Sequence, residues 1–326
     1  MRALVLDQPG TCDALRLADL PIPEPEAGQV RVRVEACALN PSDYQRAAYG
    51  ISEWEWPAVL GLDVVGVVDA VGEGVRRVGV GQRVAHLGDI RVRGGFAEYT
   101  LADASVLATV PDGLEPAAAA TVPAAGMTAY QAVVERLRVG RGDTVFVTGG
   151  AGGVGGFAVQ FAARAGARVI TTASARNTAH VKALGAEEVV DYRTEDVSAR
   201  VRELTGGRGV DAVVDAISSG SATSNLAVLA PGGGLASIAG RPDLTTVPPF
   251  GLAPSVHEIA LGSAYLLGDD RGRARLGTVL TGLLALLAEG ELDPMLARAI
   301  ALEEVPDALV ELSGRGVRGK IVYVHR

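Results

Sequence analysis

Six glycines that follow a short apolar run are the residues of this chain with the clearest chemical use. The stretch Thr144–Phe157 reads T-V-F-V-T-G-G-A-G-G-V-G-G-F. A glycine has no Cβ, so the backbone can turn tightly and its N–H groups can approach a pyrophosphate, helped by the positive N-terminus of a following helix. The stretch therefore predicts a dinucleotide site. The turn residues expected to bind it are Gly149, Gly152, Gly153, Val154 and Gly155.

The segments on either side of this turn supply the elements that must position it. Thr144–Thr148 is short, apolar and β-branched, which is typical of a strand covered on both faces. From Phe157 the sequence F-A-V-Q-F-A-A-R-A places apolar residues at helical spacing up to Gly166. A glycine-rich loop without function is the alternative. The order of strand, turn, helix and second strand favours the dinucleotide site.

The second strand, expected at Arg168–Ala173, indicates which dinucleotide is bound. An NAD site usually carries Asp or Glu at the end of this strand, where the carboxylate holds the ribose 2′-hydroxyl. Here the chain reads Ala173, Ser174, Ala175, Arg176. A hydroxyl and a guanidinium without a carboxylate suit a 2′-phosphate, so NADPH is predicted. Ser174 can be read equally as the cap of a helix over residues 177–184, which is compatible with phosphate binding there.

The wider sequence predicts an α/β protein of two domains. A β-rich unit is expected over residues 1–120 with 265–326, and a doubly wound parallel sheet of the Rossmann type over residues 121–264. A short helix is predicted at Pro41–Ala48. An exposed edge strand in the open sheet predicts a homodimer. The strands expected are Ala3–Leu6, Leu15–Leu20, Val30–Ala38, Val64–Val71, Phe96–Leu101, Thr144–Thr148, Arg168–Ala173, Glu187–Val190, Val210–Asp215, Gly234–Ala239, His257–Ala264 and Gly319–His325.

Composition narrows the class of protein. The 326 residues exceed a comfortable single core. A net charge of −8 without a basic run argues against nucleic acid and anionic membranes as partners. Cys12 and Cys37 are the only cysteines, which predicts a cytosolic protein rather than a disulfide framework. No apolar run reaches the ~20 residues of a membrane helix.

Several motifs in order resemble the medium-chain dehydrogenase/reductase superfamily, and within it the zinc-free quinone oxidoreductase group. The resemblance implies a GroES-like catalytic domain beside the Rossmann domain. The motifs are A-C-A-L-N-P-S-D-Y at Ala36–Tyr44, G-L-D-V-V-G-V-V-D-A-V-G at Gly61–Gly72, G-G-F-A-E-Y at Gly94–Tyr99, G-M-T-A-Y at Gly126–Tyr130, L-G-A at Leu184–Ala186 and G-K-I-V at Gly319–Val322.

This sequence departs from the zinc enzymes of that superfamily. They place a ligand Cys where Asn40 stands and a ligand His where Leu62 stands, and they add a lobe with four cysteines. Leucine cannot bind zinc, an asparagine amide is a poor ligand, and two cysteines cannot build a four-cysteine site. Neither a catalytic nor a structural zinc is therefore expected.

The resemblance also implies site residues. Asn40 would lie near the nicotinamide ribose and the substrate, and Tyr44, or else Tyr49, would orient a carbonyl or pass a proton. Asn40 as a turn or cap residue and Tyr44 as a packing aromatic are the alternatives. Trp54 and Trp56 suit either an apolar acceptor pocket or a loop anchored by aromatic rings.

Cofactor contacts are implied in the same way. Thr128 matches the threonine beside the nicotinamide half. Ser174, Arg176 and Tyr192 match the 2′-phosphate and adenine end, although Asn177 and Thr178 stand where relatives often carry a lysine. Backbone groups at Gly240 and Gly262 would face the carboxamide.

Without a metal, the acceptor of a hydride must already be electron-poor. A quinone meets this condition, and NADPH-dependent quinone reduction is the first hypothesis. An enone or enoyl thioester meets it too, and Arg91 and Arg93 would then be candidates for binding the thioester's phosphate. A protein that binds NADPH without turnover is the third hypothesis. All three predict a small-molecule electrophile or the cofactor alone as ligand.

Overall fold

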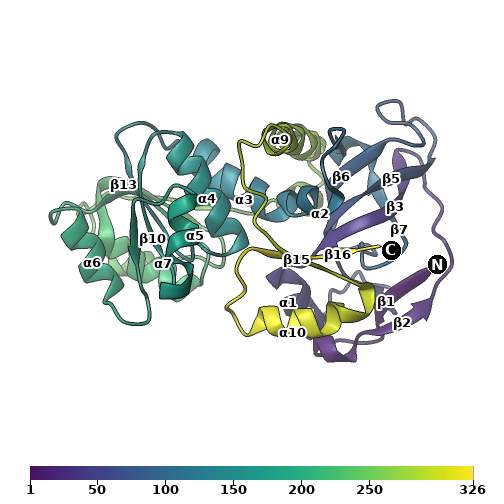
Figure 1. Cartoon of the computed structure of the whole chain (residues 1–326), viewed down its shortest axis with the longest axis horizontal. Coiled ribbons are helices and arrows are strands. Elements are labelled where there is room, and N and C mark those ends of the chain that lie inside the picture. Colours follow the sequence, from purple (N-terminus) through teal and green to yellow (C-terminus); the bar gives the residue numbers. More distant parts are fainter. Residues whose placement is uncertain (326) are drawn as a thin grey trace. The chain divides into compact units, whose positions relative to one another are not determined.

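The computed structural model describes residues 1–325, and the chain divides into two compact units (Figure 1). The first unit holds residues 1–127 together with the chain from Leu261 onward, and the second holds residues 128–260. The divisions lie close to the boundaries expected from sequence at residues 120 and 265. Each unit has a buried apolar cluster of its own.

The first unit is built on strands that pair antiparallel, except for the parallel pair β15 and β16. A larger sheet has the order β15-β16-β3-β5-β6-β8, with β7 also paired to β3, and a smaller sheet has the order β2-β1-β4. The strands are β1 Arg2–Leu6, β2 Arg16–Asp19, β3 Gln29–Ala38, β4 Ala58–Val59, β5 Asp63–Val71, β6 Arg83–Leu87, β7 Tyr99–Asp103, β8 Ala108–Thr109, β15 Leu296–Ile300 and β16 Lys320–Val324. The helices are α1 Pro41–Tyr49, α2 Pro116–Ala119, α8 Ser263–Leu266, α9 Asp270–Ala288 and α10 Val305–Ser313.

Strand β3 shows why these residues form a sheet. Val30, Val32 and Val34 are fully buried, while the intervening Arg31 and Arg33 are less buried. This alternation places one face of the strand against the core and the other towards water. Arg31 pairs with Asp69 on the neighbouring strand β5, with Nε to Oδ2 at 2.7 Å. Strand β3 ends at Ala38, two residues before Asn40, so the end of this strand leads directly into α1.

The second unit is a six-stranded parallel sheet in the order β11-β10-β9-β12-β13-β14. Phe146 and Ile170 join a core cluster with residues of α6 and α7, whereas α4 contacts β9 and β10. The strands are β9 Thr144–Val147, β10 Arg168–Thr172, β11 Glu188–Val190, β12 Val210–Asp215, β13 Leu229–Ser237 and β14 Ser255–Glu258. The helices are α4 Gly153–Arg164, α5 Thr178–Ala183, α6 Val197–Leu204 and α7 Ser219–Asn225, with the helical segment η3 Val122–Gly126, α3 Met127–Tyr130 and η4 Gln131–Arg136 near the division between the units.

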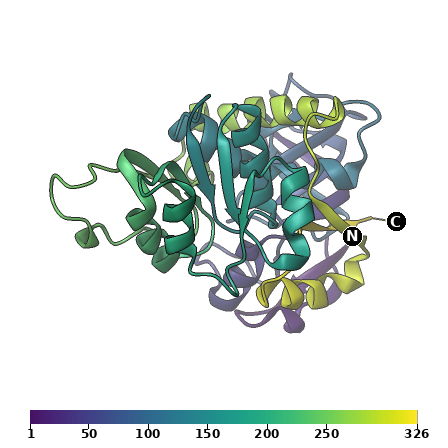
Figure 2. The same cartoon turned by 60° about the vertical axis from the view of Figure 1, so that its left-hand side comes forward.

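The predicted fold class is confirmed: a GroES-like unit and a parallel Rossmann sheet. Three predicted strands have clearly different bounds. The strand predicted at Gly234–Ala239 runs from Leu229 to Ser237. The strand predicted at Phe96–Leu101 begins at Tyr99, because Phe96 already hydrogen-bonds Leu60 outside the ladder. The strand predicted at His257–Ala264 ends at Glu258, and Ser263 begins α8 instead. The loop between β13 and β14 projects from its own sheet in Figure 2.

Two glycines of α9 offer a matched stability test. A Cβ added at Gly277 would lie 2.9 Å from Ser105 O, whereas one added at Gly282 would meet no atom within 4 Å. Alanine removes the entropic cost of a helical glycine, so Gly282→Ala is expected to stabilise the first unit by about 0.5–1 kcal/mol. Gly277→Ala is expected to destabilise it by about 1–3 kcal/mol through overpacking.

Denaturant titration can follow both variants by tryptophan fluorescence, because Trp54 and Trp56 are the only tryptophans and both belong to the first unit. Equal midpoints for the two variants would contradict the packing of α9 against the segment at Ser105.

Candidate active site

The glycine turn of the second unit has the geometry of a backbone cradle. A Cβ at Gly155 would lie 2.2 Å from Gly149 O, and one at Gly150 would lie 2.2 Å from Thr171 Oγ1. Gly149 has φ +65° and its N–H donates to Thr172 Oγ1 at 2.8 Å. Side chains are therefore excluded at these positions, and β10 holds the turn in place. The turn is therefore tightly packed, unlike a loop in which the glycines are incidental.

The helix after this turn has an open N-terminus. Gly152 precedes α4 with no side-chain cap, and the first backbone N–H to bond back within the helix is that of Gly156, to Gly152 O at 2.8 Å. The N–H groups of Gly153, Val154 and Gly155 lie in the first turn, where a helix leaves donors unsatisfied. Such donors fit the negative charge of a pyrophosphate. The predicted turn residues thus fit a bound dinucleotide.

The residues predicted for the 2′-phosphate lie at the end of β10. Ser174 is buried and precedes the short 3-10 turn Ala175–Asn177 that contains Arg176. Tyr192 follows β11 and is half-exposed, with the Arg193 guanidinium 5.8 Å from its ring centre. The residues at this end therefore come from the loops after two neighbouring strands.

A carboxylate that sequence reasoning missed lies beside this turn. Asp191 Oδ2 accepts a hydrogen bond from Ala175 N at 3.1 Å, and Asp191 Oδ1 accepts one from Arg193 N at 3.0 Å. An acidic residue is usual at the end of the second strand, whereas Asp191 follows the third. Parallel strands bring their carboxyl ends together, and this rule could have pointed to it.

The other predicted cofactor residues are distributed over both units. Gly240 follows β13 with φ +129° and lies close to Ser219. Gly262 directly precedes α8 in the first unit, and Thr128 is the partly exposed second residue of α3 in the second unit. Their cofactor contacts stay predictions.

Asn40 lies within a buried polar cluster in the first unit. Lys320 Nζ donates to Asn40 Oδ1 and to Asp63 Oδ2, the second contact at 3.0 Å. Asn40 Nδ2 donates to Asp63 Oδ2 at 3.0 Å and to Ala38 O at 3.3 Å. Asp63 Oδ1 accepts from Ala124 N at 2.8 Å. The Asn40 amide is therefore bonded at both ends within the protein, which favours a positioning role for it over contact with substrate.

Asn40 also begins α1 through a capping box. Asp43 Oδ2 accepts from Asn40 N at 2.8 Å, and Pro41 occupies the first helical position. Asn40 is thus the N-cap residue of α1, as one of the two interpretations predicted. It explains how β3, α1 and the start of β5 are held together at one point.

Asn40 and Leu62 stand where the resemblance implies zinc ligands, and their surroundings do not fit zinc. The Asn40 oxygen already accepts from the Lys320 ammonium, whose positive charge would repel a second cation, and the Leu62 side chain offers no ligand atom. Within residues 1–325, no three His, Cys, Asp or Glu side chains are grouped so as to hold a metal. His86 is fully buried with Nδ1 unpartnered in the same range, and burial lowers its pKa to about 4.

The two tyrosines proposed as proton donors lie apart from this cluster. Tyr44 is partly buried and packs against the apolar core of the first unit, as the packing alternative states. Tyr49 is 85% exposed at the C-terminal end of α1. A phenol open to bulk water is poorly suited to a site that excludes water, so the structure offers Tyr49 no support as a catalytic residue.

Arg91, suggested as a contact for a thioester phosphate, is engaged within the protein. Its Nη2 and Nε bond the Asp89 carboxylate at 2.6 and 3.0 Å, and Nη2 also donates to Tyr265 O at 3.1 Å. A guanidinium held in this way fastens the loop after β6 to α8. Arg91 is therefore a structural residue in this chain.

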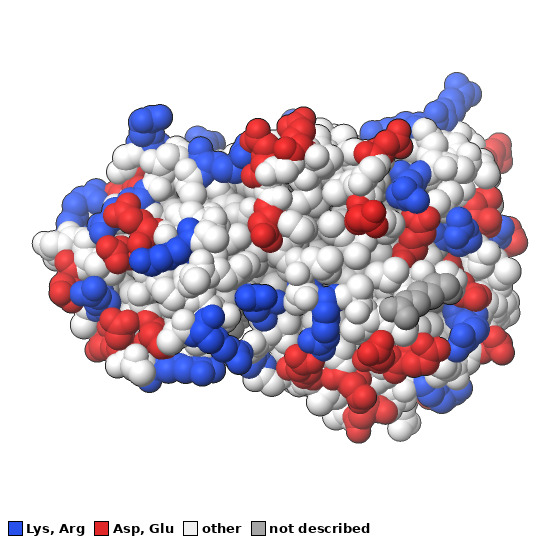
Figure 3. All heavy atoms as spheres, viewed as in Figure 1, with Lys and Arg blue, Asp and Glu red and all other residues white. Residues whose placement is uncertain are grey.

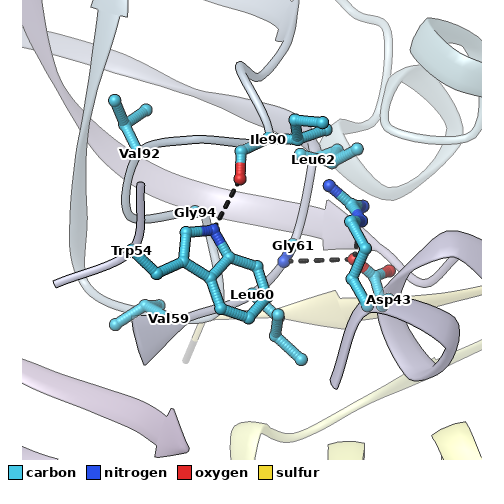
Figure 4. A pocket seen from close by; sticks show the side chains of 10 residues that line it. Asp43, Trp54, Val59, Leu60, Gly61, Leu62, Ile90, Val92 and Gly94 are labelled. Carbon is cyan, nitrogen blue, oxygen red and sulfur yellow. Dashed lines mark hydrogen bonds and ion pairs between the residues drawn. The ribbon is translucent and has the colours of Figure 1, made fainter. Parts of the chain in front are cut away.

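A small pocket with a cavity volume of about 10 Å³ lies beside α1 in the first unit (Figure 4). Trp54 forms part of the wall, and its Nε1 donates to Ile90 O at 2.7 Å. In Figure 4, Val59 and Val92 lie on one side of this ring and Asp43 on the other. The pocket residues are Asp43, Arg46, Trp54, Val59, Leu60, Gly61, Leu62, Ile90, Val92 and Gly94. Trp54 thus anchors its loop and lines a pocket, whereas the binding of an acceptor in that pocket stays a prediction.

Comparisons with known proteins agree with this fold. A family model described as an alcohol dehydrogenase GroES-like domain matches residues 26–112, and one described as a zinc-binding dehydrogenase matches residues 153–280. The chain belongs to the medium-chain dehydrogenase/reductase superfamily.

Two solved structures and one curated relative illustrate its similarities. The quinone oxidoreductase from Coxiella burnetii is 30% identical, with a TM-score of 0.86, over 100% of this chain and 99% of that one. The mycobacterial protein Rv1454c, solved with NADPH, is 31% identical, with a TM-score of 0.88, over 100% of both chains. A phenolphthiocerol/phthiocerol polyketide synthase protein from Mycobacterium tuberculosis is 34% identical over 98% of this chain, which spans 14% of that protein's length.

Proposed function

We propose that the protein is an NADPH-dependent reductase that transfers a hydride to a carbonyl-conjugated acceptor without zinc. The observation that carries this proposal is the Lys320 ammonium bonded to Asn40 and Asp63, because Asn40 stands where the resemblance implies a zinc ligand. Without a Lewis acid, the acceptor must already be electron-poor. When bound, the nicotinamide supplies the hydride from its C4.

The choice of NADPH rests on the end of β10. Ser174 and Arg176 offer a hydroxyl and a guanidinium, and the similarity to an NADPH-bound mycobacterial protein supports the same choice. Asp191 adds a negative charge at the same turn, so we expect the protein to prefer NADPH but still to bind NADH.

A quinone is the first candidate acceptor and an enone or enoyl thioester the second. The quinone is supported by the similarity to the Coxiella burnetii oxidoreductase over nearly all of both chains. The enoyl substrate is supported by the match to a segment of a polyketide synthase subunit. The predicted phenol donor is not needed for either acceptor, because solvent can protonate the reduced product.

The experiment that separates these acceptors follows NADPH absorbance while quinones, 2-alkenals and enoyl thioesters are offered in turn, with NADH as the control. Faster oxidation by quinones supports the first candidate, and faster oxidation by conjugated alkenes supports the second. Tight NADPH binding with no oxidation by any acceptor would contradict the proposal and favour a cofactor-binding sensor.

For partners, we propose a small-molecule electrophile and a second copy of this chain. Strand β14 is the outer strand of the parallel sheet and leaves one edge for pairing. On the face in Figure 3, acidic and basic side chains are interspersed, which suits neither nucleic acid nor an anionic membrane. Light scattering should give twice the 33.4 kDa of one chain. A single-chain mass would overturn the dimer.

None of the helices within residues 1–325 has the length and apolar character needed to cross a membrane. The cytosolic location expected from the two cysteines stays a prediction.

A further inference from the structure

We propose that Arg46 is a catalytic residue that donates a hydrogen bond from Nη1 to the carbonyl oxygen of the acceptor. The inference rests on the proposed reduction of a carbonyl-conjugated acceptor, and it names the side chain that hydrogen-bonds the carbonyl oxygen of that acceptor. Arg46 and Asp43 are the two charged residues of the pocket beside α1. Sequence analysis did not single out Arg46, because an arginine in a short helix usually faces solvent.

The Arg46 guanidinium is held rigidly by its own helix. Nε donates to Ser42 O at 2.9 Å and Nη2 to Ser42 Oγ at 3.0 Å. The Arg46 side chain is only 14% exposed. Within residues 1–325 no hydrogen bond to a protein atom is described for Nη1, and Nη1 is not one of the fully buried polar atoms that lack a partner. Water therefore reaches this donor, and a ligand oxygen in the pocket can take the place of that water.

The charges around Arg46 decide whether it binds a neutral or an anionic oxygen. Asp43 Oδ1 lies 3.5 Å from Arg46 Nη2 and accepts a hydrogen bond from Gly61 N at 3.3 Å. Burial raises the pKa of Asp43 and lowers the pKa of Arg46, so the two groups depend on each other for their charge. With Asp63 and Lys320 nearby, the cluster holds two carboxylates and two cations.

This balance favours a neutral ligand before reaction. A permanent anion would add an uncompensated charge to a buried neutral cluster, whereas a carbonyl oxygen would not. During reduction, negative charge develops on that oxygen, where a preorganised donor in an apolar setting gives its largest stabilisation. Trp54, Leu62 and Ile90 supply that setting.

The size of the pocket fits a single oxygen atom. Its volume of about 10 Å³ is about that needed by one water molecule. In this proposal the carbonyl oxygen of a quinone, enone or enoyl thioester takes that place, and the rest of the substrate lies outside. The same subsite serves each acceptor class proposed for this protein.

The chemical step balances without a further reagent. The electron-poor carbon of the acceptor gains a hydride, which is two electrons and a proton, and the π electrons of the conjugated system move onto the carbonyl oxygen. Arg46 keeps its protons and stabilises the resulting oxyanion through Nη1. Water then protonates the product, and NADP⁺ is the oxidised product of the cofactor.

Replacing Arg46 tests this role. Arg46→Met is expected to lower kcat/KM for the acceptor by about 100-fold, the usual effect of one oxyanion donor, while NADPH affinity is unchanged. Arg46→Lys retains a positive partner for Asp43 but lacks the planar fork, and about a 10-fold loss is expected. The control is Arg16→Met, which removes an exposed arginine paired with Asp7 in the same unit and should leave kcat/KM unchanged.

Chemical rescue separates catalysis from a structural role. Added methylguanidinium should restore part of the activity of Arg46→Ala, whereas sodium at equal ionic strength should not. Arg46→Lys and Arg46→Met with the kcat/KM of the unaltered protein would overturn the role of Arg46 while leaving the proposed function intact. Absence of NADPH oxidation in the unaltered protein would instead overturn the proposed function.

Discussion

Lys320→Met is expected to lower the free energy of unfolding of the first unit by about 3–5 kcal/mol, because it leaves a buried carboxylate without its cation. Asp63 is fully buried and Lys320 is 5% exposed, with Nζ and Oδ2 at 3.0 Å. Asp63 would keep its bonds from Asn40 and Ala124, but these are neutral donors. The loss is a large share of a typical total stability of about 5–15 kcal/mol.

Tryptophan fluorescence in a denaturant titration measures this loss in the first unit. The double variant Lys320→Met with Asp63→Asn removes both charges and should recover part of the stability. Arg16→Met breaks an exposed pair instead, and we expect a far smaller effect from it. If Lys320→Met unfolds at the same denaturant concentration as the unaltered protein, the buried cluster of Asn40, Asp63 and Lys320 does not stabilise the first unit as described.

Arg176→Ala is expected to weaken NADPH binding about 10- to 100-fold while leaving NADH binding nearly unchanged. The estimate is the loss of one hydrogen bond to a charged group, about 1.5–3 kcal/mol. The reason is that the two cofactors differ only in the 2′-phosphate, for which the turn at Ala175–Asn177 supplies the guanidinium. Cofactor titration by fluorescence gives both dissociation constants. Equal losses for NADPH and NADH would refute this assignment of Arg176.

Asp191→Asn, at the same turn, is expected to have the opposite effect on NADPH binding. An asparagine oxygen can still accept from Ala175 N, but the negative charge is removed. NADPH binding should therefore tighten, and NADH binding should change little. Together the two variants test whether the loops after β10 and β11 recognise the 2′-phosphate.

The fold was largely predictable from sequence because its strands carry strong patterns. Thr144–Val147 and Val210–Asp215 are continuous apolar runs between breakers, as buried parallel strands are. Four strands were missed. Ala58–Val59 and Ala108–Thr109 have two residues each, too few for a periodic pattern, and Arg83–Leu87 and Leu296–Ile300 lie among charged residues and turns.

The site was predictable only in part, because side-chain pairing between distant segments leaves no local pattern. Lys320 and Asn40 are separated by 280 positions. In the sequence, Lys320 is visible only as part of a closing strand, and Asp63 only as part of the motif at Gly61–Gly72. Arg46 and Asp191 depend on which loops meet in space. The glycine turn, in contrast, is contained in one continuous stretch and was predicted residue by residue.

The most direct test of the central claim is NADPH oxidation by metal-free protein. The protein is dialysed against a chelator, its zinc content is checked by elemental analysis, and NADPH carrying deuterium at C4 is offered with a quinone or an enone. We expect undiminished oxidation and, with the enone, deuterium on the carbon conjugated to the carbonyl. Activity that is lost on chelation and returns with zinc, or deuterium on the carbonyl carbon of an alcohol product, would contradict the account.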